Sequence, residues 1–219
     1  MEFSIKSCVS FGWETFKKRP WFFIGATVVV AIVYAVIGAL TSAIDALQGG
    51  STEDPTLLGS LADFLLSTLI SMGVTAFYLA AHDNPETVDL NALWHPKPFW
   101  NYLAASILLG LVIVAGFILL IIPGIIFALM FMFTTFIVVD REAGPIDAMK
   151  SSKGITRGYK WQLLGFGLVL MLINIVGAIA LLVGLLVTVP VTSLAFTHAY
   201  RVLQARAGAA PALKADATL

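Results

Sequence analysis

Positive charge is missing from several loops of this sequence, and its absence there is the most informative feature of the chain. None of the thirteen Lys and Arg residues lies in a loop that would face outward if the apolar runs were threaded through a bilayer. An excess of Lys and Arg in inner loops sets the orientation of membrane proteins. Four acids do lie at or near the predicted outer side: Asp45, Glu53, Asp54 and Asp63. The sequence therefore predicts an integral membrane protein with both termini in the cytoplasm.

Charge of either sign is scarce. Only 12% of the residues are charged and 59% are hydrophobic, whereas a soluble domain usually carries about 25% charged residues. This composition argues against a soluble globular protein, and with no basic soluble domain we expect no nucleic-acid partner. The single cysteine, Cys8, cannot form an internal disulfide, so we expect a reduced thiol that packs as a small hydrophobe.

Catalytic and cofactor motifs are absent as well. The chain has no Gly-x-Ser-x-Gly elbow, no Walker loop and no dinucleotide fingerprint, and its three histidines lack the spacing of a His-Glu-x-x-His site. We therefore expect no catalytic residues, no cofactor, no metal and no enzymatic activity.

Long apolar runs are what the sequence has in abundance. A membrane-spanning helix needs about 20 mostly apolar residues, and six runs meet this need: Trp21–Leu47, Leu57–Ala81, Trp100–Ile122, Pro123–Val139, Trp161–Leu182 and Leu185–Leu203. Pro123-Gly124 predicts a tight reversal between the third and fourth runs, because proline ends a helix and glycine permits turn conformations. Gly184 predicts the last turn.

A shorter inner segment precedes each pair of runs, at residues 11–21, 90–100 and 146–161. At the first, Phe3, Val9, Trp13 and Phe16 approximate one helical face, which is typical of a helix lying in the membrane interface with its apolar side in lipid. The predicted fold is all-α and polytopic: six transmembrane helices as three hairpins, each preceded by a cytoplasmic interfacial amphipathic helix. Residues 1–207 form a single transmembrane domain with candidate repeats 1–82, 83–140 and 141–207, and residues 208–219 a flexible cytoplasmic tail. The alternative to repeats is that inner loops generally favour Trp, Lys and Pro.

Three polar residues inside the apolar runs are candidate functional groups: Asp63, Asn174 and His198. An acid such as Asp63 would suit a proton or cation pathway, and its structural alternative is a first-turn acid favoured by the helix dipole. For Asn174 the alternative is a helix–helix hydrogen bond, and for His198 an anchor at the headgroups. Ala31, Ala35, Ala39 and Ala43 form a stripe of small residues that suits packing within the chain or between chains, and we expect packing within the chain.

Two basic clusters are candidate contacts for anionic lipid headgroups. They are Lys17, Lys18 and Arg19, and Lys150, Lys153, Arg157 and Lys160. Each base near an anionic surface contributes roughly 1 kcal/mol. The topology already requires cations at these places, so orientation alone is the alternative explanation.

Short motifs mark the carboxy-terminal half: Ile122-Pro123-Gly124-Ile125, Val138-Val139-Asp140 and Gly144-Pro145-Ile146-Asp147-Ala148, followed by Ser151 or Ser152, Gly158, Trp161 and Pro190. With these motifs residues 100–205 resemble the YciC-like uncharacterised bacterial integral membrane proteins, which are related to the membrane domain fused to some glycerophosphodiester phosphodiesterases. The resemblance implies a membrane domain and brings no activity with it, because the phosphodiesterase chemistry belongs to a soluble domain that we do not expect here.

We expect a non-enzymatic protein of the bacterial inner membrane that organises lipid or assists a membrane complex. Its partners would be membrane lipids, including anionic headgroups, and a second copy or another membrane protein. The alternative is a transporter of a small molecule, ion or lipid with a cavity between the hairpins. A third hypothesis, a lipid enzyme using His198 or Asp63, has no visible nucleophile–base pair behind it.

Overall fold

The computed structural model describes residues 3–51, 53–180 and 183–216, with side chains up to residue 208. The elements in order are α1 (Ile5–Lys18), α2 (Pro20–Leu47), α3 (Leu57–Asp83), the 3-10 helix η1 (Leu90–Leu93), α4 (Phe99–Leu119), α5 (Ile121–Phe131), α6 (Thr134–Arg141), α7 (Pro145–Ile155), α8 (Lys160–Ile179) and α9 (Leu185–Asp216). No strand occurs within these ranges, so the all-α prediction is confirmed.

Five stretches of helix are long and apolar enough to cross a membrane: Pro20–Leu47, Leu57–Asp83, Phe99–Leu119, Ile121–Arg141 and Lys160–Ile179. They coincide with the first five predicted runs, although the predicted end of the fifth, Leu182, lies outside the described residues. The predicted sixth run lies in α9, which is more polar because it carries several hydroxyl side chains as well as His198 and Arg201. Helix α9 continues to Asp216, so it also contains most of the predicted tail. Residues 217–219 are not described.

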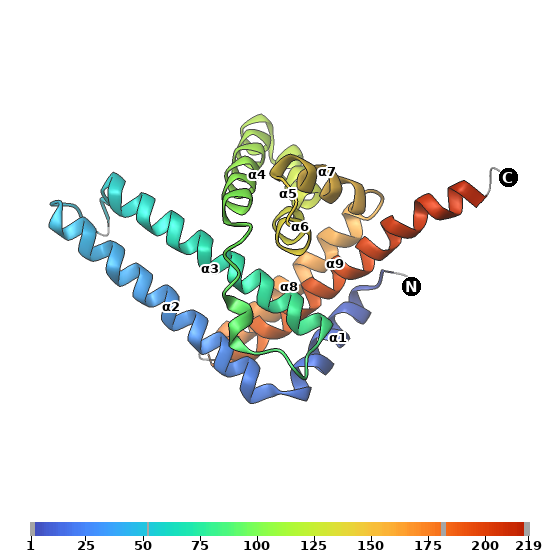
Figure 1. The fold of residues 1–219 in the computed structure, drawn as a ribbon, viewed down its shortest axis with the longest axis horizontal. Helices are drawn as coiled ribbons and strands as arrows, with labels where there is room; N and C mark the ends of the chain where they lie inside the picture. The colour runs from blue at the N-terminus through green and yellow to red at the C-terminus, as the bar shows by residue number, and fades with distance from the viewer. Residues whose placement is uncertain (1–2, 52, 181–182, 217–219) are drawn as a thin grey trace.

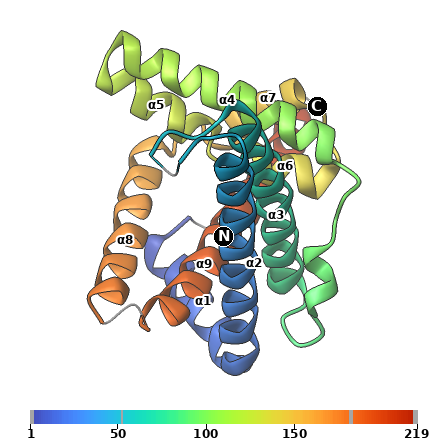
Figure 2. The same ribbon diagram turned by 90° about the vertical axis from the view of Figure 1, so that its left-hand side faces the viewer.

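The helix pairs run in different directions. In Figure 1, α2 and α3 lie side by side and extend to the left, whereas α9 extends to the right. Figure 2 shows the α4–α5 pair lying across the top of the molecule, steeply inclined to α2 and α3. Consecutive apolar helices contact one another in α2–α3, α4–α5 and α8–α9, and the three candidate repeats stay a prediction.

Helix α1 packs on protein along the face that was predicted to lie in lipid. Phe3 and Phe16 are buried, and α1 lies against α9. A Cβ atom added at Gly12 would overlap the carbonyl oxygen of Val191, so only glycine permits this close approach. The prediction of a lipid-facing surface was wrong for Phe3 and Phe16, and α1 forms part of the bundle.

The second predicted interfacial helix is a single 3-10 turn, η1, followed by residues 94–96 without regular structure and a turn at Lys97-Pro98. Two prolines, Pro96 and Pro98, stop any α-helix here because they lack the amide donor and clash with the preceding turn. The third predicted segment does form a helix, α7, with Pro145 in its first turn.

The reversal between α4 and α5 comes at Leu120, whose extended backbone breaks the helix (φ −171°, ψ 158°). The predicted turn at Pro123-Gly124 was therefore three residues late. Pro123 fits the first turn of α5, where its missing amide has no partner to lose. Gly124 serves close packing, because a Cβ there would overlap the ring of Phe117.

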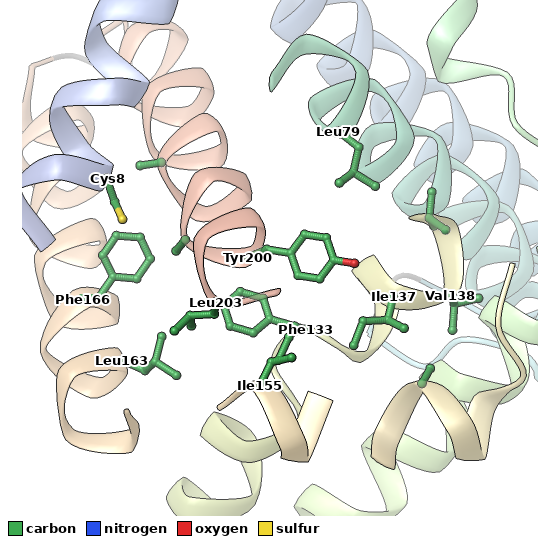
Figure 3. Packing of buried hydrophobic residues seen from close by; sticks show 14 of the residues in the cluster. Cys8, Leu79, Phe133, Ile137, Val138, Ile155, Leu163, Phe166, Tyr200 and Leu203 are labelled. Carbon is green, nitrogen blue, oxygen red and sulfur yellow. The ribbon is translucent and has the colours of Figure 1, made fainter. Parts of the chain in front are cut away.

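The main core joins α1, α3, α6, α8 and α9. Figure 3 shows Cys8 pointing toward Phe166, with Tyr200 and Phe133 beside Leu203. Phe133, Phe166 and Tyr200 are completely buried and their rings form a run of aromatic contacts with Phe196. By contrast, the stripe Ala31, Ala35, Ala39 and Ala43 is exposed, so the expectation that it packs within the chain was wrong.

Candidate functional site: a four-cation pocket

Four cationic side chains converge on one pocket of about 560 Å³ where α7 meets α8. The lining consists of Met130, Lys150, Lys153, Gly154, Arg157 and Lys160. The second basic cluster found in the sequence is therefore one site in space. Hereafter it is called the four-cation pocket.

Helix α7 is fixed beside a break in the preceding apolar helix. The break between α5 and α6 at Met132-Phe133 frees backbone groups that the helix would otherwise pair. Ser152 donates its hydroxyl hydrogen to the carbonyl of Met130 (3.0 Å) and accepts the amide of Phe133 (3.3 Å). Thr156 also donates to Met130 (3.1 Å). These bonds satisfy buried polar groups and hold α7, with its two lysines, against α5 and α6.

The turn from α7 to α8 places the other two cations. Gly158 has φ +88°, a left-handed conformation that favours glycine. Tyr159 follows, with its hydroxyl hydrogen-bonded by Arg206 and its ring against Phe3. Lys160 then begins α8, and the neighbouring Trp161 is 84% exposed. Exposed tryptophan beside a cation is typical of a helix end at a membrane interface.

The pocket keeps a strong positive charge. No acidic side chain lines it in the described part of the chain. Lys150 lies 3.8 Å from Asp147, but both side chains are about three-quarters exposed, so the pair contributes little. Lysine and arginine bind phosphate and carboxylate oxygens through charge-assisted hydrogen bonds, so the arrangement suits the binding of an anionic group.

The first basic cluster does not form a comparable site. Arg19 donates to the carbonyls of Glu86 (3.0 Å) and Val88 (2.9 Å), and its guanidinium lies 4.1 Å from the ring centre of Phe22. It therefore fixes the loop after α3. Lys17 and Lys18 are exposed.

The three candidate polar residues, Asp63, Asn174 and His198, lie in different surroundings. Asp63 is exposed on α3. Asn174 donates to Thr192 (3.1 Å) and joins α8 to α9, which is the helix–helix bond weighed from the sequence. The ring nitrogen of His198 lies 3.1 Å from that of His82, and Phe11 stacks on His198 at 4.1 Å between ring centres. His198 therefore joins α9 to α3 and α1.

A polar network that the sequence did not single out lies next to His198. Arg201 of α9 bonds Asp140 of α6 (2.7 Å) and Asp83 of α3. Asp140 also accepts from Tyr200 (2.8 Å) and Gln204 (3.0 Å). Asp140 stands in the motif Val138-Val139-Asp140, but no sequence pattern links it to Arg201, which lies 61 residues further along the chain. Asp83, 118 residues before Arg201, marks only the end of an apolar run.

A metal centre is not indicated. Within the described ranges no group of three or more His, Cys, Asp or Glu side chains could hold an ion.

Comparison with known proteins gives a family without an assigned activity. Over 92% of its length, the chain is 25% identical to the uncharacterised protein Rv2560 of Mycobacterium tuberculosis (strain ATCC 25618 / H37Rv), of which the match covers 69%. The same identity and coverage hold for the uncharacterised protein Mb2590 of Mycobacterium bovis. No solved structure matches. The YciC-like resemblance is not supported by these matches and stays a prediction. Residues 98–215 match the domain of unknown function DUF7847, and the chain belongs to that family.

Proposed function

We propose that this chain is a non-enzymatic, multi-pass protein of the bacterial cytoplasmic membrane that holds anionic lipid headgroups in the four-cation pocket and so organises lipid or a partner complex. The convergence of Lys150, Lys153, Arg157 and Lys160 on one pocket is the observation that carries this proposal. The sorting of cations along the sequence supports six crossings with both termini in the cytoplasm.

The place of the pocket also supports a lipid as its ligand. It lies directly before the apolar helix α8, so a headgroup seated there would leave its acyl chains beside that helix. Four bases attract an anionic surface by roughly 4 kcal/mol in total at about 1 kcal/mol each. The hydrogen bonds of Ser152 and Thr156 to Met130 fix α7 and so hold Lys150 and Lys153 at the pocket in the lipid-free protein.

Native mass spectrometry of the purified protein can test the proposal. Protein from nanodiscs with equal phosphatidylglycerol and phosphatidylcholine is expected to retain phosphatidylglycerol preferentially. The double variant Lys153→Gln, Arg157→Gln should lower that preference about thirtyfold, because it removes two of the four bases and so about 2 kcal/mol of attraction.

The matched control is Lys17→Gln, Lys18→Gln, which removes the same charge from the exposed end of α1. It should retain the wild-type preference. Equal losses in both variants would mean that net charge alone attracts the lipid, and no preference in the wild type would end the proposal.

Transport of a small molecule, ion or lipid is the second candidate function. A groove between α2, α3, α8 and α9, lined partly by polar side chains, is the observation that favours it.

A further inference from the structure

A second hollow lies halfway along the apolar helices, away from the four-cation pocket. It is a groove of about 500 Å³ between α2, α3, α8 and α9. Its polar lining includes Tyr34 at the middle of α2, Ser71, Thr75 and Tyr78 on α3, and Asn174, Thr192 and Ser193 on α8 and α9. Hereafter it is called the hydroxyl groove.

The polar groups of the hydroxyl groove are all uncharged. Ser71 is hydrogen-bonded to Tyr102 (2.9 Å) and Asn174 to Thr192 (3.1 Å), so part of the lining is already satisfied by the protein. The remaining lining is apolar, with Val30, Leu170 and Phe196 among it. A charged ligand would find no opposite charge here and would carry a large desolvation penalty.

The mouth of the groove faces the same surroundings as the outer faces of α2 and α8. Tyr34 is 40% exposed and Met171 59% exposed at its two sides, and their neighbours Ile32 and Leu172 are exposed apolar residues. If these helices lie in hydrocarbon, a ligand reaches the groove sideways from the lipid phase. An apolar body with a small, uncharged polar part matches this path.

We infer that the hydroxyl groove binds an uncharged, hydroxyl-bearing lipid of the diacylglycerol class. The volume lies in the range of small-molecule sites and suits a glycerol unit with the first methylenes of its chains, while the rest of each chain stays in the bilayer. The hydroxyls of Tyr34 and Ser193, which line the groove, hydrogen-bond with the hydroxyl and ester groups of the ligand. This inference is independent of the proposed headgroup site, since it uses different residues and a different lipid charge.

Photo-cross-linking in nanodiscs tests the inference. A diacylglycerol with a diazirine near the glycerol is reconstituted with the wild-type protein in phosphatidylcholine, and labelled peptides are mapped by mass spectrometry. Labels are expected on residues 30–34 and 170–174, and unlabelled diacylglycerol should compete for them. Met171→Trp should lower labelling about tenfold by filling the mouth.

Leu172→Trp is the matched control, because it places the same indole on an equally exposed neighbour that does not line the groove; it should label as the wild type does. Tyr34→Phe gives a second test that keeps the shape and removes one hydroxyl, with an expected loss of about three- to tenfold.

Several results would overturn the inference. Unchanged labelling in both Met171→Trp and Tyr34→Phe would show that the groove is not the site. Equal competition by phosphatidylcholine would mean general lipid contact, and equal competition by glycerol would mean a water-soluble ligand. Labels confined to a second copy of the chain would identify a protein interface.

Discussion

At the scale of single residues, Asp140 is the less exposed of the two acids in the network at the ends of α3, α6 and α9. Its carboxylate accepts hydrogen bonds from Tyr200, Arg201 and Gln204. The side chain of Asp140 is 14% exposed, whereas that of Asp83 is 45% exposed. Low exposure makes the loss of a charged partner more costly, because water cannot replace it.

Asp140→Asn is therefore expected to lower the free energy of unfolding by about 1–3 kcal/mol, and Asp83→Asn by less. Equilibrium unfolding in mixed detergent micelles measures both. The exposed Asp63→Asn serves as the control and should stay within about 0.5 kcal/mol of the wild type. Equal effects of the three variants would contradict this ranking.

Cys8 offers a prediction about pH. Burial raises the pKa of the Cys8 thiol to about 11, since desolvation disfavours the thiolate. About one thiol in ten thousand is then ionised at pH 7, against a few per cent for a free cysteine. Alkylation by N-ethylmaleimide at pH 7 should be roughly a hundredfold slower in the folded protein than in SDS, and should accelerate as the pH rises toward 11.

A cysteine at the exposed neighbouring position provides the control for Cys8. The double variant Ser7→Cys, Cys8→Ala should react in the folded state nearly as fast as in SDS. If wild-type Cys8 reacted equally fast, the thiol would be neither buried nor shifted.

The acids show how far sequence reading reaches at this scale. Asp63 was singled out because it falls inside an apolar run, yet it is exposed. Asp45 lies at the end of its run, yet it is buried and accepts from the amide (2.7 Å) and hydroxyl (2.6 Å) of Thr56. Hydropathy gives the position of an acid along a helix, but its burial depends on which helix faces it across the turn.

At the scale of elements, α7 shows how a short polar helix is fixed in an apolar protein. Its start could be predicted because Pro145 and Asp147 are ordinary first-turn residues. Its role could not, because the break at Met132-Phe133 that it stabilises lies within an uninterrupted apolar run. No residue at the break predicts it. The hydroxyls that stabilise it belong to Ser152 and Thr156, which lie 19 and 26 residues further along the chain than their partners.

The double variant Ser152→Ala, Thr156→Val removes these hydroxyls and leaves the backbone groups of Met130 and Phe133 without these partners. We expect a loss of about 1–3 kcal/mol in unfolding free energy. We also expect a weaker phosphatidylglycerol preference although all four cations remain, because α7 no longer positions two of them. Equilibrium unfolding in micelles measures the loss of stability, and native mass spectrometry measures the lipid preference.

Ser151→Ala is the control for this pair, since it removes a hydroxyl from the neighbouring position. It should change neither stability nor lipid retention. A double variant that is destabilised but keeps full lipid preference would show that the pocket does not depend on the position of α7.

At the scale of the whole molecule, the sequence predicts which segments are apolar but not the directions in which they pack. The predicted runs coincide with α2, α3, α4, α5–α6 and α8. Their mutual inclination in Figures 1 and 2 was not predictable, because a helix that is apolar all round has no polar face to show which side meets its neighbour. Close contacts instead depend on single glycines such as Gly12 and Gly124.

The proposed topology turns on α9. Five and six crossings both place the loop before α9, with the exposed Val183, outside, and only six return the end of α9 to the cytoplasm. In a Cys8→Ala background, Val183→Cys should react with a membrane-impermeant maleimide in intact cells, as Gln48→Cys in the loop after α2 should. Lys97→Cys and Arg157→Cys should react only after the membrane is opened, because both cations belong to inner loops.

Gly208→Cys, near the far end of α9, should react only after the membrane is opened. A Gly208→Cys that reacts from outside alongside a reactive Gln48→Cys would establish five crossings and leave the end of α9 outside, and a protected Val183→Cys would mean that α8 does not cross. Labelling of Lys97→Cys or Arg157→Cys from outside would instead reject the charge-based orientation as a whole. In that case the four-cation pocket would face away from the anionic lipids of the cytoplasmic leaflet, and the headgroup proposal would lose its electrostatic basis. The topology experiment therefore tests the orientation on which the proposed function depends.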